Sequence, residues 1–456
     1  MRKTGILVIF VLFLNMAAYA QTTIDLEEAR ILALANSPSL KRYETSIRNS
    51  ILSEQNQLYS MLPQVSAGYS ASMRFLNTTT TPGTSDTKTE FINPFDNISG
   101  SINLSISQVL FQGGKSFIQK AILAIDTETV RNNALSEYYK VLSDVDSAYY
   151  AVLEANASYE AAQSSLQAAN LALEIAEVRF NNGMINQIEY LRAQADKESR
   201  ENLRNQRQRT LSQNMITLRD LIGITGTFTL MPVSFDPYED VLVRLARISN
   251  EDADALYENL WDVIAVSNLS LANAALNSRK AELNYSTIVR DYAPTISLSL
   301  SSEILSYSSA NGFSGPTANG SVSLRGTIPL DFWVLNNRVE RGKISRDNTL
   351  NEYSNTERTQ EQSLLNTLYS ILTQAGQVLY SRRSLEISQS TYEYQMERYR
   401  LSQSSVKDVG DASISLIESQ NSLNSASYSF LKNLSNLRTL CALDDEERLI
   451  NILLGR

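Results

Sequence analysis

The sequence predicts an α+β membrane protein in which strands of about ten residues are joined to exceptionally long helices. Strict alternation of apolar and polar side chains predicts the strands, as along residues 102–107. Residues 114–180 contain no proline, and no glycine after the first position, which predicts a helix about 100 Å long. Both patterns occur twice along the 456 residues, so an internal two-fold sequence repeat is expected as well.

Residues 1–20 are expected to be a cleaved signal peptide. Arg2 and Lys3 precede an apolar run over residues 5–14, and Ala18-Tyr19-Ala20 has the small-residue pattern of a cleavage site. A membrane anchor is the alternative, but the run is about half as long as the roughly 20 residues that a spanning helix needs. Beyond residue 20 no uninterrupted apolar stretch reaches that length, so insertion into a membrane would have to use the strands.

Four strands are expected, at about residues 64–77, 98–111, 294–308 and 319–332. Their alternation fits transmembrane barrel strands, with one face toward lipid and the other toward water. A soluble, half-buried sheet has the same pattern, and alternation alone leaves both interpretations open. The connecting loops, 78–97 and 309–318, are rich in Thr, Ser, Gly, Asn and Pro and suit solvent-exposed tips.

Four long helices are expected, at about residues 114–180, 186–222, 338–401 and 406–440. Along the first, large residues recur every seventh position from Tyr138 to Phe180, and alanines recur beside them from Ala148 to Ala176. A large seam next to an alanine seam lets helices approach closely in a left-handed supercoil. A cytoskeletal coiled coil is the alternative, which the signal peptide and the alternating strands disfavour.

The repeat determines the predicted domain organisation. Three pairs of segments match between the halves: 61–70 with 292–301, 100–104 with 320–324, and 179–180 with 398–399. The first structural repeat is therefore placed at 21–223, an inter-repeat equatorial segment at 224–250, the second repeat at 251–440 and a C-terminal tail at 441–456.

Composition excludes several classes of function. The chain carries 40 Lys+Arg against 49 Asp+Glu, a net charge of −9, so nucleic acid is not an expected partner. It contains no histidine, which excludes histidine-dependent catalysis and histidine-ligated metals. The single cysteine, Cys441, excludes an intrachain disulfide and thiolate clusters. We expect no enzyme, no cofactor and no metal site.

The strand count requires an oligomer, because a transmembrane barrel needs at least eight strands and the chain offers four. Three segments then indicate a family: Leu110–Gly114 after the second strand, Arg179–Met184 at the first turn between long helices, and Tyr399–Ala412 at the second. In this order, on a duplicated strand-and-helix plan, they make the chain resemble the TolC-like outer membrane efflux proteins, the outer membrane factors. The resemblance covers essentially the whole chain after residue 20.

The resemblance implies a homotrimer in the Gram-negative outer membrane. Three chains would complete a 12-stranded barrel in outer-membrane lipid, continued into the periplasm as a tube of 12 helices. Such a protein is a passive, gated exit duct of a tripartite efflux pump or a type I secretion system. Its partners would be a periplasmic adaptor, also called a membrane fusion protein, and an inner-membrane transporter. A secreted coiled-coil scaffold or adhesin without a pore is the alternative.

Carboxylates near the second turn are the candidate gate. Asp408 and Asp411 are three residues apart, hence on one helix face. The resemblance implies that they point into the lumen at the periplasmic entrance, where three chains would bring six carboxylates together. A ring of this kind attracts cations and traps divalent ions. Glu189 holds the matching acidic position in the first repeat, and Tyr399 matches a tyrosine that helps to hold relatives closed. A solvated helix face is the alternative for all four residues.

The resemblance also assigns the two turns as docking points for the adaptor. The first comprises Asn182, Gly183 and Met184, and the second comprises Leu401, Ser402 and Gln403, with serine where relatives have glycine. Ser404 stands where relatives carry an arginine that latches the entrance.

A short segment at residues 113–116, Gly-Gly-Lys-Ser, resembles the end of a phosphate-binding loop. The earlier glycine that such a loop requires is replaced by Val109, so phosphate binding is not expected. Gly113 and Gly114 are expected instead to free the backbone at a strand-to-helix bend.

Overall fold

The computed structural model describes residues 22–80, 87–308, 312–314, 320–401 and 403–455. The expected signal peptide, Ser402 and parts of both predicted loops lie outside these residues. Among the described helices, none combines the length and the apolar composition that a bilayer-spanning helix needs.

The chain divides into two compact units. The first contains residues 1–40, 136–267 and 363–456, and the second contains 41–135 and 268–362. These units differ from the predicted repeats, because each unit takes segments from both halves of the chain. The two longest helices, α3 (Lys115–Asn181) and α8 (Phe332–Arg400), contribute residues to both units.

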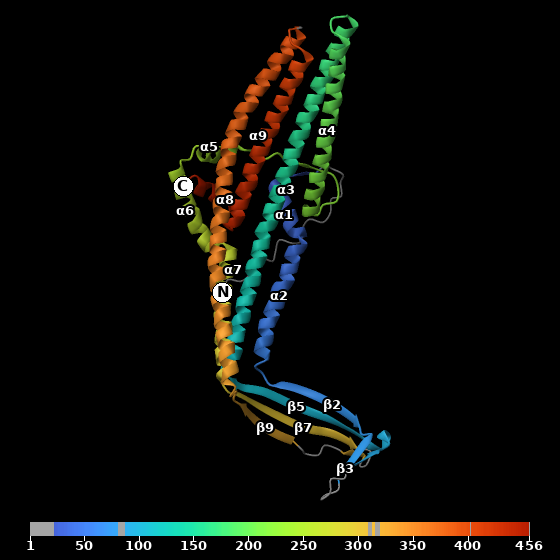
Figure 1. Ribbon diagram of the computed structural model, residues 1–456, viewed down its shortest axis with the longest axis vertical. Coiled ribbons are helices and arrows are strands. Elements are labelled where there is room, and N and C mark those ends of the chain that lie inside the picture. The colour runs from blue at the N-terminus through green and yellow to red at the C-terminus, as the bar shows by residue number, and fades with distance from the viewer. Residues whose placement is uncertain (1–21, 81–86, 309–311, 315–319, 402, 456) are drawn as a thin grey trace. The chain divides into compact units, whose positions relative to one another are not determined.

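The second unit contains an antiparallel sheet in the order β2–β5–β7–β9 (Figure 1). Its strands are β2 (Gln64–Met73), β5 (Ile98–Gln112), β7 (Thr295–Ser308) and β9 (Gly320–Thr327). The short β8 (Gly312–Ser314) pairs with the end of β7. Within the described part of the chain, β2 pairs with β5 alone and β9 with β7 alone, so both lateral edges of the sheet are open.

Two strands are shorter than the sequence predicts. The first ends at Met73, because its partner strand β5 begins at the paired residue Ile98. The chain continues into a separate hairpin of β3 (Leu76–Thr80) and β4 (Thr87–Phe91), followed by the 3₁₀ turn η1 (Pro94–Asn97). The fourth strand ends at Thr327 rather than at 332, since Pro329 has no N–H for a sheet. Helix α8 therefore begins at Phe332 rather than at 338.

The two faces of the sheet differ sharply. Serines oppose serines across the strands, and their hydroxyls are hydrogen-bonded at 2.7–3.0 Å in the pairs Ser66–Ser105, Ser70–Ser101, Ser72–Ser99, Ser299–Ser323 and Ser301–Ser321. We call this side the serine face. The other side is apolar and exposed, with Tyr69 at 89% and Val322 at 72% exposure. The alternation predicted from sequence thus gives one hydroxyl face and one apolar face.

Helices of the second unit are held by polar side chains. They include α2 (Pro38–Tyr59), most of which lies in this unit, and α7 (Leu269–Val289), which ends in the 3₁₀ turn η3 (Arg290–Tyr292). Asn273 of α7 hydrogen-bonds Asn132 and Asn133 of α3, and Lys280 pairs with Asp126. At the bend between β5 and α3, Gly113 has φ +66°, and a Cβ there would lie 2.6 Å from the Cβ of Ala293. Glycine is required at this bend, which fits the expectation for Gly113.

The first unit contains the remaining helices. They are α1 (Leu26–Asn36), α4 (Gln187–Ile222), α5 (Glu239–Leu245), which follows the 3₁₀ turn η2 (Asp236–Tyr238), α6 (Asn250–Ser267), α9 (Val406–Leu440) and α10 (Glu446–Leu453). A short parallel pair joins β1 (Thr22–Ile24) to β6 (Phe228–Leu230). The segment predicted as a tail thus contains a helix, in which Leu449 and Leu453 are buried.

The alanine seam of α3 is buried in this unit. Ala162 is 1% exposed and Ala176 is 0% exposed. Of the seam of large residues, Val145 and Val152 are buried as well, whereas Phe180 at its end is 37% exposed. Small side chains permit close helix approach, so the alanine seam contributes to the intrachain packing of α3.

A buried ionic cluster connects the chain's terminal segments to the long helices. Asp146 of α3 is fully buried and accepts hydrogen bonds from Arg30 of α1 at 2.6 and 2.8 Å and from Ser435 of α9 at 2.6 Å. Arg438 lies 3.5 Å from the same carboxylate, and Glu446 of α10 contacts both arginines at 3.7 and 3.6 Å. Burial alone would lower the pKa of Arg30, but Asp146 outweighs it and raises that pKa.

We expect Asp146→Asn to destabilise the protein by about 3–5 kcal/mol, because it leaves two arginines buried without their main carboxylate. Urea unfolding of the detergent-solubilised protein, followed by far-UV circular dichroism, measures the change. Asp144→Asn on the same helix is the matched control, since that side chain is exposed and should shift stability by under about 0.5 kcal/mol. Equal midpoints for the two variants would show that the cluster does not stabilise the fold.

Candidate functional site

The turn between α3 and α4 is built around Gly183. Its φ is +68°, a value that glycine adopts without a steric penalty. The N–H of Met184 donates to the carbonyl of Arg179 at 2.8 Å, and that of Gly183 donates to Phe180 at 2.9 Å, which closes the end of α3. The predicted docking residues Asn182, Gly183 and Met184 are all exposed, with Met184 at 71%.

The turn between α8 and α9 repeats one of these bonds. The N–H of Gln403 donates to the carbonyl of Arg398 at 2.8 Å, which matches the bond from Met184 to Arg179. Leu401 and Gln403 are exposed. Ser402, the residue predicted to replace a glycine, lies outside the described part of the chain.

Asp408 occupies the third position of α9 and forms a capping box with Ser405. Its carboxylate accepts from the backbone N–H of Ser405 at 3.0 Å and from the Ser405 hydroxyl at 2.8 Å. The backbone bond, then the hydroxyl bond, lower the pKa of Asp408, so the side chain is ionised at neutral pH. The hydroxyl of Ser404, at the predicted latch position, lies 3.2 Å from the same carboxylate and 3.0 Å from the amide oxygen of Gln395, and these two acceptors share its proton.

Asp411 faces a cation on its own helix. The ammonium group of Lys407 lies 2.9 Å from its carboxylate, and both side chains are more than half exposed. The hydrogen bond to Asp411 raises the pKa of Lys407. Water screens an exposed pair of this kind and the pair opens readily, so Asp411 stays available to other cations.

Tyr399 is buried, at 1% exposure, against Ala172, Met396 and Val409. Its hydroxyl donates to the carbonyl of Ala172 at 3.4 Å. Contacts of this tyrosine therefore join α3, α8 and α9 within one chain.

Arg179 of α3 belongs to the site, although the sequence did not indicate it as a site residue. Its guanidinium lies 4.4 Å from the centre of the Tyr399 ring and donates to the Tyr399 carbonyl. Burial raises the pKa of Tyr399, Arg179 lowers it and Glu189 raises it, so Glu189 also lies within electrostatic reach of the ring. The sequence repeat did mark the position, because Arg179 in the first half matches Arg398 in the second.

Arg200 of α4 is a second contact that the sequence did not indicate. It is 6% exposed, pairs with Asp196 at 3.1 Å and donates to the carbonyl of Gly410 at 3.4 Å. This bond ties α4 to the first turns of α9, close to Asp408 and Asp411. An arginine four residues after an aspartate is common on exposed helices, so the sequence pattern did not indicate that Arg200 is buried.

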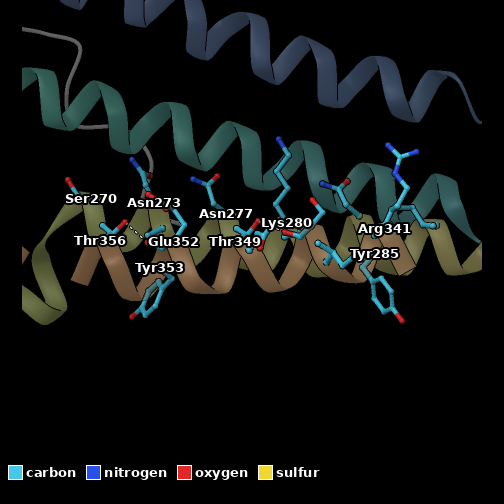
Figure 2. Close-up of a pocket in the computed structure, with 18 residues that line it drawn as sticks. Ser270, Asn273, Asn277, Lys280, Tyr285, Arg341, Thr349, Glu352, Tyr353 and Thr356 are labelled. Atoms are coloured by element: carbon cyan, nitrogen blue, oxygen red, sulfur yellow. Dashed lines mark hydrogen bonds between the residues drawn. The ribbon is translucent and has the colours of Figure 1, made fainter. Parts of the chain in front are cut away.

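A groove of about 930 Å³ between α7 and α8, in the second unit, is a separate hollow. Figure 2 shows Asn273, Asn277 and Lys280 pointing from α7 toward α3. Its polar lining consists mainly of amides and hydroxyls. Among the residues that the structure describes, no group of three His, Cys, Asp or Glu side chains is placed to hold a metal. At the start of α9, in contrast, the ionised carboxylate of Asp408 and the exposed pair of Lys407 and Asp411 are suited to binding ions.

Comparisons with known proteins agree on one family. The family model described as outer membrane efflux protein matches residues 30–224 and 260–442. The chain is 22% identical over 382 residues to the outer membrane protein TolC of Salmonella enteritidis, covering 78% of this chain and 72% of that protein.

Solved structures share the fold. The CmeC outer membrane channel of Campylobacter jejuni superposes with a TM-score of 0.72 at 16% identity, covering 93% of this chain and 88% of its own. The outer membrane protein VceC of Vibrio cholerae gives 0.69 at 13% identity, covering 91% and 96%.

We expect Arg179→Ala to loosen the tip of α8, because it removes a cation–π contact and a hydrogen bond to Tyr399. Contacts of this kind contribute about 1–2 kcal/mol together, equivalent to roughly tenfold faster hydrogen exchange of nearby amides. Exchange over residues 395–401, followed by mass spectrometry, measures this. Arg400→Ala is the control, since Arg400 is exposed and contacts Glu397 at 3.7 Å. Identical exchange in both variants would contradict a tip held by Arg179.

Proposed function

This chain belongs to the outer membrane efflux protein family, and from that premise we propose that it is the gated exit duct of a tripartite efflux pump or a type I secretion system. The family places it in the Gram-negative outer membrane, as a channel for efflux or secretion and not an enzyme. The proposal is supported above all by a sheet with two open edges and one exposed apolar face, and by the ionised carboxylate of Asp408 near the start of α9.

Closure of the sheet leads to a trimer. An open edge leaves backbone N–H and C=O groups unpaired, which hydrocarbon does not tolerate. Joining β2 of one copy to β9 of the next pairs these groups, and three copies of four strands give a 12-stranded barrel. The apolar face, with Val65 at 65% and Leu324 at 67% exposure, would then contact outer-membrane lipid, and the serine face would line the lumen. The long helices would continue as a periplasmic tube of 12 helices.

The internal repeat supports this arrangement. The turn bonds from Met184 to Arg179 and from Gln403 to Arg398 are related by the same shift of 219 residues as the sequence match. Two similar halves per chain would give a trimer six similar hairpins of helices around its axis.

The gate is proposed at the tips of α8 and α9. Asp408 and Asp411 of three copies would place six carboxylates at the periplasmic entrance, with Glu189 of each chain nearby. Local hydrogen bonds keep Asp408 charged, and Lys407 competes with solution cations for Asp411. Tyr399 is proposed to hold the tip closed through Arg179, in place of the latch that Ser404 lacks.

The exposed turns are proposed as docking points for a periplasmic adaptor. Residues 182–184 and 401–403 present Met184 and Leu401 to solvent, and exposed apolar side chains at a projecting tip suit a partner surface. An inner-membrane transporter would supply the energy for transport. Residues 1–20 would direct the chain across the inner membrane.

Planar-bilayer recording tests the duct and its gate together. We expect the purified protein to form cation-preferring channels, and Asp408→Asn with Asp411→Asn to reduce that preference several-fold and to weaken block by divalent cations. Asp254→Asn with Glu258→Gln on α6 is the control for the same charge change elsewhere. Absence of channels would refute the duct. Channels with unchanged selectivity in the double variant would refute the carboxylate gate.

Docking is tested by crosslinking in cells followed by purification of this protein. We expect Met184→Glu with Leu401→Glu to reduce the crosslinked periplasmic adaptor at least several-fold, because a charge opposes burial of each tip. Channel conductance should be unchanged. Val266→Glu on α6, at a residue that is 88% exposed, is the control. Full adaptor recovery in the tip variant would place docking elsewhere.

A further inference from the structure

Charge is nearly absent from the four main strands. Across β2, β5, β7 and β9 the ionisable acidic and basic residues are Glu303 and Arg325. Every other polar position in these described strands is serine, threonine, asparagine or glutamine, apart from tyrosines at 69 and 307. One acid and one base therefore account for the formal charge of the sheet.

Both charges lie on the serine face. Register pairs place Arg325 opposite Ser297, and Glu303 opposite Asn103. Directly opposed residues of an antiparallel pair share a face, and Ser297 and Asn103 belong to the serine series of their strands. An irregularity in β7 after Glu303 keeps Ser306 opposite Ser101, so the face continues past it.

The surroundings of Glu303 support the same orientation. A hollow of about 310 Å³ is lined by Glu303 together with serines of three strands: Ser70, Ser72, Ser99, Ser101, Ser306 and Ser308. The strand register places Glu303 and Arg325 too far apart to pair with each other, and the ion pairs among the described residues include neither of them. Both charges are therefore free to act on ions in the space that the serine face borders.

The two charges stand at different depths. Arg325 lies opposite the third residue of β7, near the helical end of the sheet, and Glu303 lies six residues farther along that strand. Six residues span about 20 Å, roughly twice the Debye length at physiological salt. The two positions therefore act on a passing ion one after the other, without cancelling.

We propose that Glu303 and Arg325 determine the ion preference of the barrel lumen. The inference rests on the proposed trimeric duct, in which each residue becomes a ring of three like charges. The Arg325 ring stands near the junction with the helices, and the Glu303 ring stands toward the opposite mouth. Between them the wall is uncharged hydroxyl. A ring of like charge in a narrow lumen raises the local concentration of its counter-ion.

When the charge of one ring is removed, the other ring determines the ion selectivity of the lumen. Glu303→Gln leaves three arginines and shifts selectivity toward anions, whereas Arg325→Gln leaves three glutamates and shifts it toward cations. Each shift is expected to be about threefold or more in the permeability ratio at 0.1 M salt and to shrink at 1 M, where the Debye length falls to about 3 Å. Opposite signs for the two variants serve as a control for general damage.

The recordings use the Asp408→Asn, Asp411→Asn background, so that the proposed gate does not dominate selectivity.

Cysteine variants then test which face of the sheet lines the lumen. Cys441 is 0% exposed, and burial raises its thiol pKa to about 12, so it reacts little with thiol reagents. Glu303→Cys and Leu305→Cys form a matched pair, because Leu305 lies opposite Ile102 on the apolar face.

We expect a sulfonate-bearing methanethiosulfonate to modify Glu303→Cys in the bilayer and to restore the cation preference lost on substitution. Leu305→Cys should not react. Reaction of Leu305→Cys but not of Glu303→Cys, or equal permeability ratios for the Gln variants and their parent, overturns this inference while channels remain. Absence of channels in the parent overturns the proposed duct and this inference with it.

Discussion

The main sheet has two open lateral edges, and we propose that their closure organises the molecule. Strands β2 and β9 each pair on one side alone within the described chain, and the face between them exposes large apolar side chains. Water does not stabilise such a face and lipid does not tolerate such edges, so both requirements are met together when copies of the chain close the sheet inside a bilayer. In such a barrel the strand register, which places serine opposite serine, would line the lumen with hydroxyl groups.

Polar interactions in the first unit divide into a permanent and a labile class. Asp146 is fully buried and held by two arginines and a serine, and breaking such a cluster is expensive. Near the start of α9, the pair between Asp411 and Lys407 is instead exposed on both sides. Parts that open and close are expected at weakly held positions, which fits a gate at the tips.

Much of the fold could be predicted because its periodicities are long. Alternation along residues 98–107 specifies a strand with two unlike faces, and the absence of proline from 115 to 181 specifies one continuous helix. Strand ends were predicted too late where a partner strand or a proline ends the pairing, as at Met73 and before Pro329. The compact units could not be predicted, because contacts between distant segments define them.

The candidate site was predicted in part. Asp408 and Tyr399 were selected through family resemblance, and the capping role of Asp408 was missed although Ser405 stands three residues before it, the spacing of a capping box. Arg200 reaches α9 through a backbone carbonyl, and such a contact leaves no residue pair to recognise in sequence. Arg179 contacts the Tyr399 ring as well as its carbonyl, but the two residues are 220 positions apart in the chain. The charges of the sheet were visible in sequence, but their shared face follows from the strand register.

Native mass spectrometry of the protein extracted in mild detergent tests the proposed edge closure, because closure by copies of the chain fixes how many chains assemble. We expect a complex of three chains and no stable population of single chains. A monodisperse single chain that keeps its strand content would contradict it, since the sheet edges would then be stable without a neighbour.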